Sequence, residues 1–235
     1  MYWKLGAQRD SALTRFEQSM NVRSENAAKF WRMSRMGFTM YKGKPFGYFG
    51  GDDMRLDAAR VYIRRLTQDD IPALLSLRLQ NREFLRPFEP IMPDSHYTLA
   101  GQQEFLSNLQ QNWDNRSGYG LGIFLISTHQ LIGRVALSNV VHGAWESCTI
   151  GYFMDQNFNG LGLMTEAVRL AIHFAFEFAS LHRVQAAVMP RNIASIRVLE
   201  KVGFRYDGFS EYYLKINGIW EHHNLYSLTR ERWHA

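Results

Sequence analysis

Two glycines, separated by one residue, stand between a predicted strand and a long apolar helix. The segment reads Asn159-Gly-Leu-Gly-Leu-Met-Thr-Glu166 and follows a strand-like run at 149–154. Glycine lets the chain turn tightly, and the helix that follows presents unpaired N–H groups with partial positive charge. Such a turn is suited to hold a phosphate or pyrophosphate. We expect Glu166, in the first helical turn, to stabilise the helix dipole.

A dinucleotide-binding fingerprint is the first alternative for this loop. That motif needs a third glycine and a parallel β-α-β unit. Here the third glycine is missing, the preceding strand belongs to a predicted antiparallel meander, and the stretch before Gly160 is long. We therefore do not predict a dinucleotide site.

The composition is that of an ordinary globular protein, with 46% hydrophobic and 21% charged residues among 235. No apolar run reaches the roughly 18 residues of a membrane span, and the N-terminus lacks a secretory signal, so we expect a cytoplasmic protein. Cys148 is the only cysteine, which rules out an internal disulfide and a multi-cysteine zinc site. Because Cys148 falls in a strand-like run, we expect a buried core residue rather than a nucleophile.

Residues 1–53 form a basic N-terminal extension with nine Lys/Arg against five Asp/Glu, which is +4 of the net charge of +5. The nearly neutral remainder argues against a nucleic-acid-binding body. Two interpretations stay open: an arm that contacts ribosomal RNA, and a solvated or loosely docked extension upstream of a natural start at Met54. We favour the second. The Gly/Pro-rich stretch 42–51 predicts a linker that separates this extension from a domain at 54–235.

Hydrophobic periodicity beyond residue 56 predicts the elements that must position the loop. We expect strands at 61–66, 122–127, 131–140, 147–154 and 183–189, and a C-terminal hairpin of 204–215 and 219–228 turned at Asn217-Gly218. We expect helices from near 69, at 99–113, at 163–178 and at 192–201. This order predicts an α/β (α+β) fold, a mixed sheet with helices on both faces.

Further motifs follow the glycine loop. Pro190-Arg-Asn-Ile-Ala-Ser-Ile-Arg-Val-Leu-Glu-Lys-Val-Gly-Phe204 resembles the second signature of the GNAT N-acetyltransferases, and the loop at 159–166 resembles the acetyl-CoA pyrophosphate loop of that family. Segments 81–90, 137–143 and 213–228 are similar to the RimJ-type branch, which contains ribosomal-protein alanine N-acetyltransferases. The resemblance covers roughly residues 56–230, in order.

The resemblance implies the GNAT acyl-CoA N-acyltransferase fold, in which two central strands splay and the pantetheine arm of acetyl-CoA lies between them. Those strands would be 149–154 and 183–189. Two residues depart from the family pattern, Asn159 in place of Gln/Arg and Met164 in place of Gly/Ala. Because backbone amides bind the phosphates, these departures keep the site. The residues expected to bind acetyl-CoA are Tyr152, Phe153, Met154, Asn159, Gly160, Leu161, Gly162, Leu163, Met164, Thr165 and Asn192.

The resemblance further implies two catalytic residues, Asn192 near the thioester and Ser195 as the group that protonates the leaving thiolate. A helix N-cap for Asn192 and a self-bonded helix hydroxyl for Ser195 are the structural alternatives. The tyrosine acid and the strand glutamate base of other members correspond here to Leu199 and Thr149, so neither route is present. An α-amine, with a pKa of ~7.7–8.0, is partly neutral at pH 7, so a water relay would suffice as base.

Several other side chains are weaker candidates. His222 could relay protons together with His223, but we favour two histidines at the solvent edge of a strand. Trp220, beside the hairpin turn, could form a wall of the acceptor groove. No histidine shows metal-ligand spacing, so we predict no metal. The candidate carboxylate helpers are Glu83, Glu89 and Glu146, and the groove candidates are Glu89, Trp220 and His222.

We therefore expect transfer of acetyl from acetyl-CoA, in a ternary complex, to the N-terminal α-amine of a protein, with an alanine-starting small-subunit ribosomal protein as the target implied by the branch. Two alternatives stay open. The first is acetylation of a small amine such as a peptide antibiotic, an aminoglycoside or a polyamine, which an acidic pocket would favour. The second is a ribosome-assembly or regulatory protein that binds acetyl-CoA without efficient turnover. No membrane partner is expected.

Overall fold

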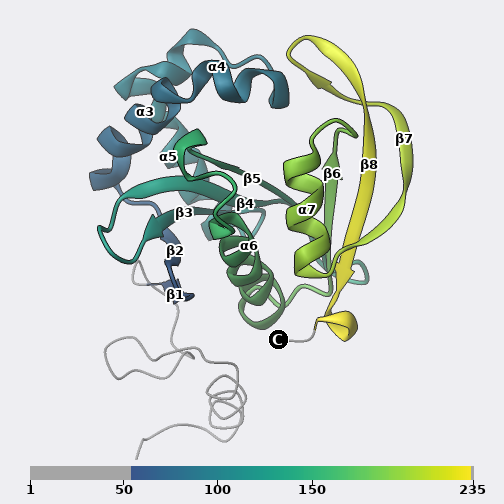
Figure 1. The fold of residues 1–235 in the computed structure, drawn as a ribbon. Coiled ribbons are helices and arrows are strands. Elements are labelled where there is room, and N and C mark those ends of the chain that lie inside the picture. The colour runs from purple at the N-terminus through teal and green to yellow at the C-terminus, as the bar shows by residue number, and fades with distance from the viewer. Residues whose placement is uncertain (1–53, 234–235) are drawn as a thin grey trace, which may run out of the picture. The chain divides into compact units, whose positions relative to one another are not determined.

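The computed structural model describes residues 54–233, so the predicted basic extension at 1–53 lies outside the described residues. An eight-stranded sheet runs through the fold in the order β1-β2-β3-β4-β5-β6-β8-β7 (Figure 1). Its strands are β1 Arg55–Asp57, β2 Val61–Arg65, β3 Tyr119–Leu125, β4 Leu131–Val141, β5 Ser147–Met154, β6 Arg183–Val188, β7 Arg205–Ile216 and β8 Ile219–Thr229. Neighbouring strands are antiparallel except β5 and β6, which confirms the expected mixed sheet.

Five helices pack with the sheet among the described residues 54–233. They are α3 Ile71–Gln80, α4 Arg82–Leu85, α5 Leu99–Asp114, α6 Leu163–His173 and α7 Ile193–Val202. The helix expected at 163–178 is α6 followed by a π-helical turn, Phe174–Phe178. Within residues 54–233, no helix is both long and apolar enough to cross a membrane. The cytoplasmic location stays a prediction.

The start of α3 shows why this segment is helical. Asp70 accepts hydrogen bonds from the backbone N–H of Thr67 at 2.8 Å and from the Thr67 hydroxyl at 3.2 Å. Pro72 stands in the first turn, where its missing N–H costs nothing. A 3-10 turn, Gln68–Asp70, precedes the regular helix, so the predicted start near Asp69 is close to the observed one.

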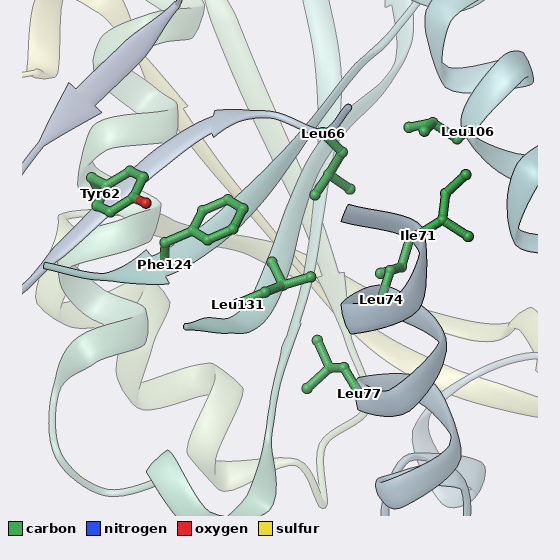
Figure 2. Close-up of a cluster of buried hydrophobic side chains, with 8 residues drawn as sticks. All are labelled: Tyr62, Leu66, Ile71, Leu74, Leu77, Leu106, Phe124 and Leu131. Carbon is green, nitrogen blue, oxygen red and sulfur yellow. The ribbon is translucent and has the colours of Figure 1, made fainter. Parts of the chain in front are cut away.

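A cluster of buried apolar side chains fixes α3 and α5 to the sheet. Figure 2 shows the side chains of α3 packed beside those of β3 and β4, with Leu106 of α5 near them. Burying one such leucine or isoleucine contributes about 1.5–3 kcal/mol. The cluster therefore holds both helices over one face of the sheet. Its members are Tyr62, Leu66, Ile71, Leu74, Leu77, Leu106, Phe124 and Leu131.

Strand β3 begins at Tyr119, earlier than the 122 expected from sequence. The first part of this strand contains Gly120 and Gly122. Because glycine is rare in strand interiors, the sequence pattern does not indicate a strand there. A Cβ at Gly120 would come within 2.9 Å of the Leu109 side chain of α5. Glycine therefore lets α5 approach the backbone of the sheet at this point.

The parallel pair β5 and β6 separates after a short contact. Ser147 to Thr149 pair with Arg183 to Gln185, and the pairing ends there, although β5 continues to Met154 and β6 to Val188. β4 pairs with the far edge of β5 as far as Met154, and β8 pairs with the far edge of β6 as far as Val188. The expected splay between the two central strands is confirmed.

Candidate active site

The glycine loop connects the end of β5 to the start of α6. Gly160 has φ +77° and Gly162 has φ +80°, a left-handed conformation that residues with a Cβ rarely adopt. The first hydrogen bond of α6 runs from Glu166 N to Gly162 O, at 3.3 Å. The N–H groups of residues 163–165 therefore have no acceptor inside the helix. This geometry fits the binding of a pyrophosphate, the role expected from the sequence.

Glu166 ties the start of α6 to the start of β2. Its carboxylate accepts hydrogen bonds from Arg60 Nε at 2.7 Å and from Arg60 N at 3.0 Å. The Arg60 guanidinium also stands beside Gly162, where a Cβ would lie 3.3 Å from Nη2. The contacts of Glu166 are thus structural, at the N-terminal end of the helix, as its position in the sequence indicates.

Ser195 and Tyr152 meet across the splay. The Tyr152 Oη lies 2.9 Å from Ser195 Oγ, joining β5 to α7, the helix that follows β6. Burial raises the pKa of Tyr152 above its ordinary value, and the hydrogen bond with Ser195 offsets part of that shift. Asn192 caps α7, with its Oδ1 accepting from Ser195 N at 3.1 Å. The N-cap interpretation of Asn192 is therefore confirmed, and its contact with acetyl-CoA stays a prediction.

The side chain of Tyr152 is a candidate that sequence reasoning missed. From the sequence, only its backbone is expected to take part. The tyrosine position of other family members is occupied by Leu199, which is fully buried. Tyr152 and Ser195 are 43 residues apart in sequence. No spacing in the sequence signals their contact, since it depends on how β5 and α7 are brought together.

A cavity of about 800 Å³ lies beside β5. Residues from α3, α5, the segment 85–92, β3, β4 and β5 line it, including Gly151, Tyr152 and Phe153. The size is within the range of small-ligand sites, roughly 300–1,000 Å³. The cavity therefore reaches the strand on which the acetyl donor is expected.

Four ionisable side chains dominate the charge of the cavity lining. Arg78, 4% exposed, pairs with Glu89 through Nη2 and Oε1 at 2.6 Å. Burial, Arg78 and Arg134 together lower the pKa of His96 to about 4. Burial and the neighbouring Arg78 lower the pKa of Arg134 to about 10. At pH 7 the histidine is therefore neutral and Arg134 remains charged.

The three candidate carboxylates lie in different surroundings. Glu83 is exposed and pairs with Arg86 at 3.3 Å. Glu146 is exposed as well, and its backbone carbonyl accepts from His182 N at 2.7 Å. Glu89 alone of the three lines the cavity.

The hairpin residues Trp220 and His222 do not line this cavity in the described structure. Trp220 is 57% exposed. His222 Nδ1 accepts a hydrogen bond from Tyr212 N at 3.0 Å, where β7 is irregular. His223 is buried, so the expected position at the solvent edge is wrong for this histidine, and burial lowers its pKa. The observed contacts of His222 are structural, and the catalytic and groove roles of these residues stay predictions.

Cys148 is a core residue, as expected. It is 2% exposed, and burial raises the pKa of its thiol to about 12. Over the part of the chain that the structure describes, no group of three or more His, Cys, Asp or Glu side chains could hold a metal ion.

The model of the GNAT acetyltransferase domain matches residues 60–205. The chain belongs to this family and is an N-acetyltransferase, which confirms the membership expected from the loop and the second signature. The probable N-acetyltransferase YjcK of Bacillus subtilis is 42% identical over 173 residues, covering 74% of this chain and 96% of that protein.

Two further relatives belong to the RimJ-type branch. The ribosomal protein uS5-alanine N-acetyltransferase of Escherichia coli is 34% identical over 189 residues, which covers 80% of this chain and 97% of that protein. The structure of Mycobacterium smegmatis RimJ in complex with CoA-disulfide has a TM-score of 0.70 and 30% identity, covering 73% of this chain and 82% of that one. The expected resemblance to the branch is confirmed.

Proposed function

We propose that this enzyme transfers acetyl from acetyl-CoA to the N-terminal α-amine of a protein, with an alanine-starting small-subunit ribosomal protein as the target. The observation that carries the proposal is the splay of β5 from β6 beside a cavity of about 800 Å³. The splay offers free strand edges to a donor arm, and the cavity offers room for an acceptor. The 34% identity to a uS5-alanine acetyltransferase supports this choice of acceptor.

On the donor side, acetyl-CoA supplies the activated thioester. The N–H groups of the loop at 159–165 would hold its pyrophosphate. The free edge of β5 at Tyr152, Phe153 and Met154 would pair with the pantetheine amides, since this stretch has no partner in β6. Asn192, at the first turn of α7, would contact the same arm. These residues orient the thioester toward the cavity.

On the acceptor side, the amine must lose a proton before it attacks the carbonyl carbon. The cavity is net positive, with Arg78 and Arg134 charged against the single carboxylate of Glu89. A positive environment lowers the pKa of an amine. Since a free α-amine already has a pKa of ~7.7–8.0, the neutral nucleophile is well populated at pH 7 without a carboxylate base. Water then carries the proton away.

As the C–N bond forms and the C–S bond breaks, the departing thiolate needs a proton. The Ser195 hydroxyl would donate it and be reprotonated by Tyr152, whose phenol is 2.9 Å away. The raised pKa of Tyr152 keeps that phenol protonated across the neutral range. The pair thus forms a short relay.

Among small amines, the cavity charge argues against the polycationic ones. An aminoglycoside or a polyamine would meet two arginines and one glutamate. Like charges in a poorly solvated site repel, so these acceptors should bind weakly. A peptide antibiotic with a free α-amine stays the small-molecule alternative, because its reacting group is the same.

Release of free thiol measures acetyl transfer and so tests the proposal directly. The enzyme is mixed with acetyl-CoA and an alanine-starting peptide, spermidine or an aminoglycoside, with the N-acetylated peptide as control. We expect turnover with the free peptide and none with the acetylated one. Mass spectrometry of N-terminal peptides from cells with and without the gene would then identify the target. Turnover on spermidine or the aminoglycoside alone would refute the proposal.

A further inference from the structure

Arg134 presents a charged guanidinium to the cavity without an ion-pair partner of its own. It lies on β4, opposite Phe153 of β5, and its guanidinium carbon is 4.7 Å from the ring centroid of Phe105. The ring contact stabilises a cation without neutralising it. Among residues 54–233, no carboxylate forms an ion pair with Arg134. Glu89 is near enough to raise its pKa, but that carboxylate is bonded to Arg78. Arg78, in the same lining, has such a partner in Glu89.

A poorly solvated charge is costly unless an opposite charge or hydrogen bonds compensate it. Elsewhere in this cavity that compensation exists: Arg78 is paired with Glu89, and His96 is neutral at pH 7. Arg134 keeps its charge, because its lowered pKa of about 10 is still well above neutrality. With two arginines and one glutamate, the cavity therefore carries an excess positive charge that one further anion would neutralise.

We propose that Arg134 binds a carboxylate of the acceptor. The inference rests on the proposed function, under which that carboxylate belongs to an aspartate or glutamate close to the acceptor's N-terminus. A guanidinium matches a carboxylate with two parallel hydrogen bonds, which gives orientation as well as attraction. Arg134 would then be a specificity-determining residue of this enzyme.

The register of β4 and β5 sets how far the acid stands from the amine. Arg134 is opposite Phe153 and Val135 is opposite Tyr152, the residue that contacts Ser195, so Arg134 and Tyr152 are adjacent in register and their side chains leave the sheet on opposite faces. An extended chain spans about 3.3–3.6 Å per residue. The long arginine side chain adds to that separation, so the acidic residue belongs at the second to fourth position of the acceptor.

Matched peptides test this assignment. Alanine-starting peptides carry Glu or Gln at position 2, 3 or 4 and are otherwise identical. They are assayed with the wild-type enzyme and with Arg134→Gln, Arg134→Lys and Arg205→Gln. Arg205 is exposed on the edge strand β7 and does not line the cavity, so its substitution removes the same charge elsewhere.

We expect wild type to prefer Glu over Gln at one position by about ten- to a hundredfold in kcat/KM, the range of a hydrogen bond to a charged group. Arg134→Gln should abolish the preference by slowing only the Glu peptide, Arg134→Lys should keep part of it, and Arg205→Gln should keep it all. Equal rates for Glu and Gln peptides in wild type would overturn the inference. So would an equal slowing of both by Arg134→Gln.

Two further arms separate this inference from the proposed function. Binding of the N-acetylated Glu and Gln peptides to the CoA-loaded enzyme, followed by fluorescence anisotropy, should show the same preference without turnover. Free amino acids and their carboxamides form the other arm. If only the free amino acids are acetylated, and this depends on Arg134, the carboxylate site is supported and the proposal of a protein acceptor is refuted. If peptides are acetylated without a preference for an acidic residue, the proposed function is supported and the carboxylate-binding role of Arg134 is refuted.

Discussion

The phenol oxygen of Tyr152 lies 2.9 Å from the hydroxyl oxygen of Ser195. Tyr152 belongs to β5 and Ser195 to α7, so the hydrogen bond spans the place where β5 and β6 separate. A leaving thiolate in that gap would meet a hydroxyl that a second hydroxyl can reprotonate. The pair could serve in place of the tyrosine acid of other family members, whose position is occupied here by Leu199.

The first prediction concerns this pair. Ser195→Ala should lower kcat by about a hundredfold, the lower end of general acid catalysis, and leave acetyl-CoA affinity unchanged. Tyr152→Phe should have a similar but smaller effect, and the double variant should be no slower than Ser195→Ala, because the two groups act as one unit. Steady-state kinetics with thiol detection measures all three. Tyr206→Phe, at an exposed position of β7, is the control. Wild-type rates in Ser195→Ala would remove this residue from the mechanism.

The pH dependence follows from the direction of the Tyr152 shift. Because burial raises its pKa, the phenol stays protonated at alkaline pH and continues to serve as an acid. We expect kcat/KM to rise through the acceptor amine's pKa of ~7.7–8.0 and then stay level to about pH 10. A falling limb between pH 8 and about 10 that disappears in Tyr152→Phe would show that the phenol has an ordinary pKa.

The glycine loop gives a prediction with a matched control. Gly160, with φ +77°, and Gly143, with φ +76°, both have open space where a Cβ would stand. Alanine at either position should cost about 1–2 kcal/mol of backbone strain. At Gly160 that strain should distort the phosphate loop and raise the KM for acetyl-CoA by about 5- to 30-fold. Gly143→Ala should lose similar stability in urea unfolding with an unchanged KM. Equal KM values would contradict a phosphate-binding loop.

Acid stability should depend on Asp70. Burial alone would raise the pKa of this carboxyl, but hydrogen bonds from Arg64, at 2.7 Å, and from Thr67 hold it below its ordinary value of 3.8. A depressed carboxyl pKa stabilises the fold above the unfolded-state pKa, and this contribution is lost as pH falls through the folded-state value.

Asp70→Asn should therefore lower the free energy of unfolding by about 2 kcal/mol at pH 7. Urea titrations at pH 7 and near pH 2 measure the difference, which should shrink in acid as the wild-type carboxyl becomes protonated and loses its charge. Asp69→Asn, at the exposed neighbouring position, should change little. A deficit in Asp70→Asn that is equally large in acid would assign the effect to packing rather than charge.

Cys148 should be unreactive in the folded enzyme. Its thiol is buried and its pKa is raised to about 12, so the reactive thiolate is scarce at pH 8. A chromogenic disulfide reagent should label no thiol per chain in buffer and one in denaturant. Rapid labelling of the native enzyme would show that this strand opens. Acetylation assays based on thiol release should consequently have no background from the protein.

Most elements of the fold are predictable from residues that lie close together in the sequence. The Asn217-Gly218 turn was predictable because both residues take positive φ, 45° and 83°, as a two-residue hairpin requires. The capped start of α3 and the left-handed glycines before α6 depend in the same way on residues close in sequence. The sequence does not indicate the true start of β3, because Gly120 is needed for close packing against α5, a contact that the sequence pattern does not show.

The sequence by itself predicted the donor side of this enzyme, since the proposed phosphate loop is built from consecutive residues and their backbone conformations. The tertiary structure decided which side chains meet where the two substrates would react. The Tyr152–Ser195 contact and the unpaired charge of Arg134 beside Phe105 join residues from separate elements. Their chemistry depends on distance, burial and the presence or absence of a neutralising neighbour. Those quantities exist only once the sheet and its helices have packed.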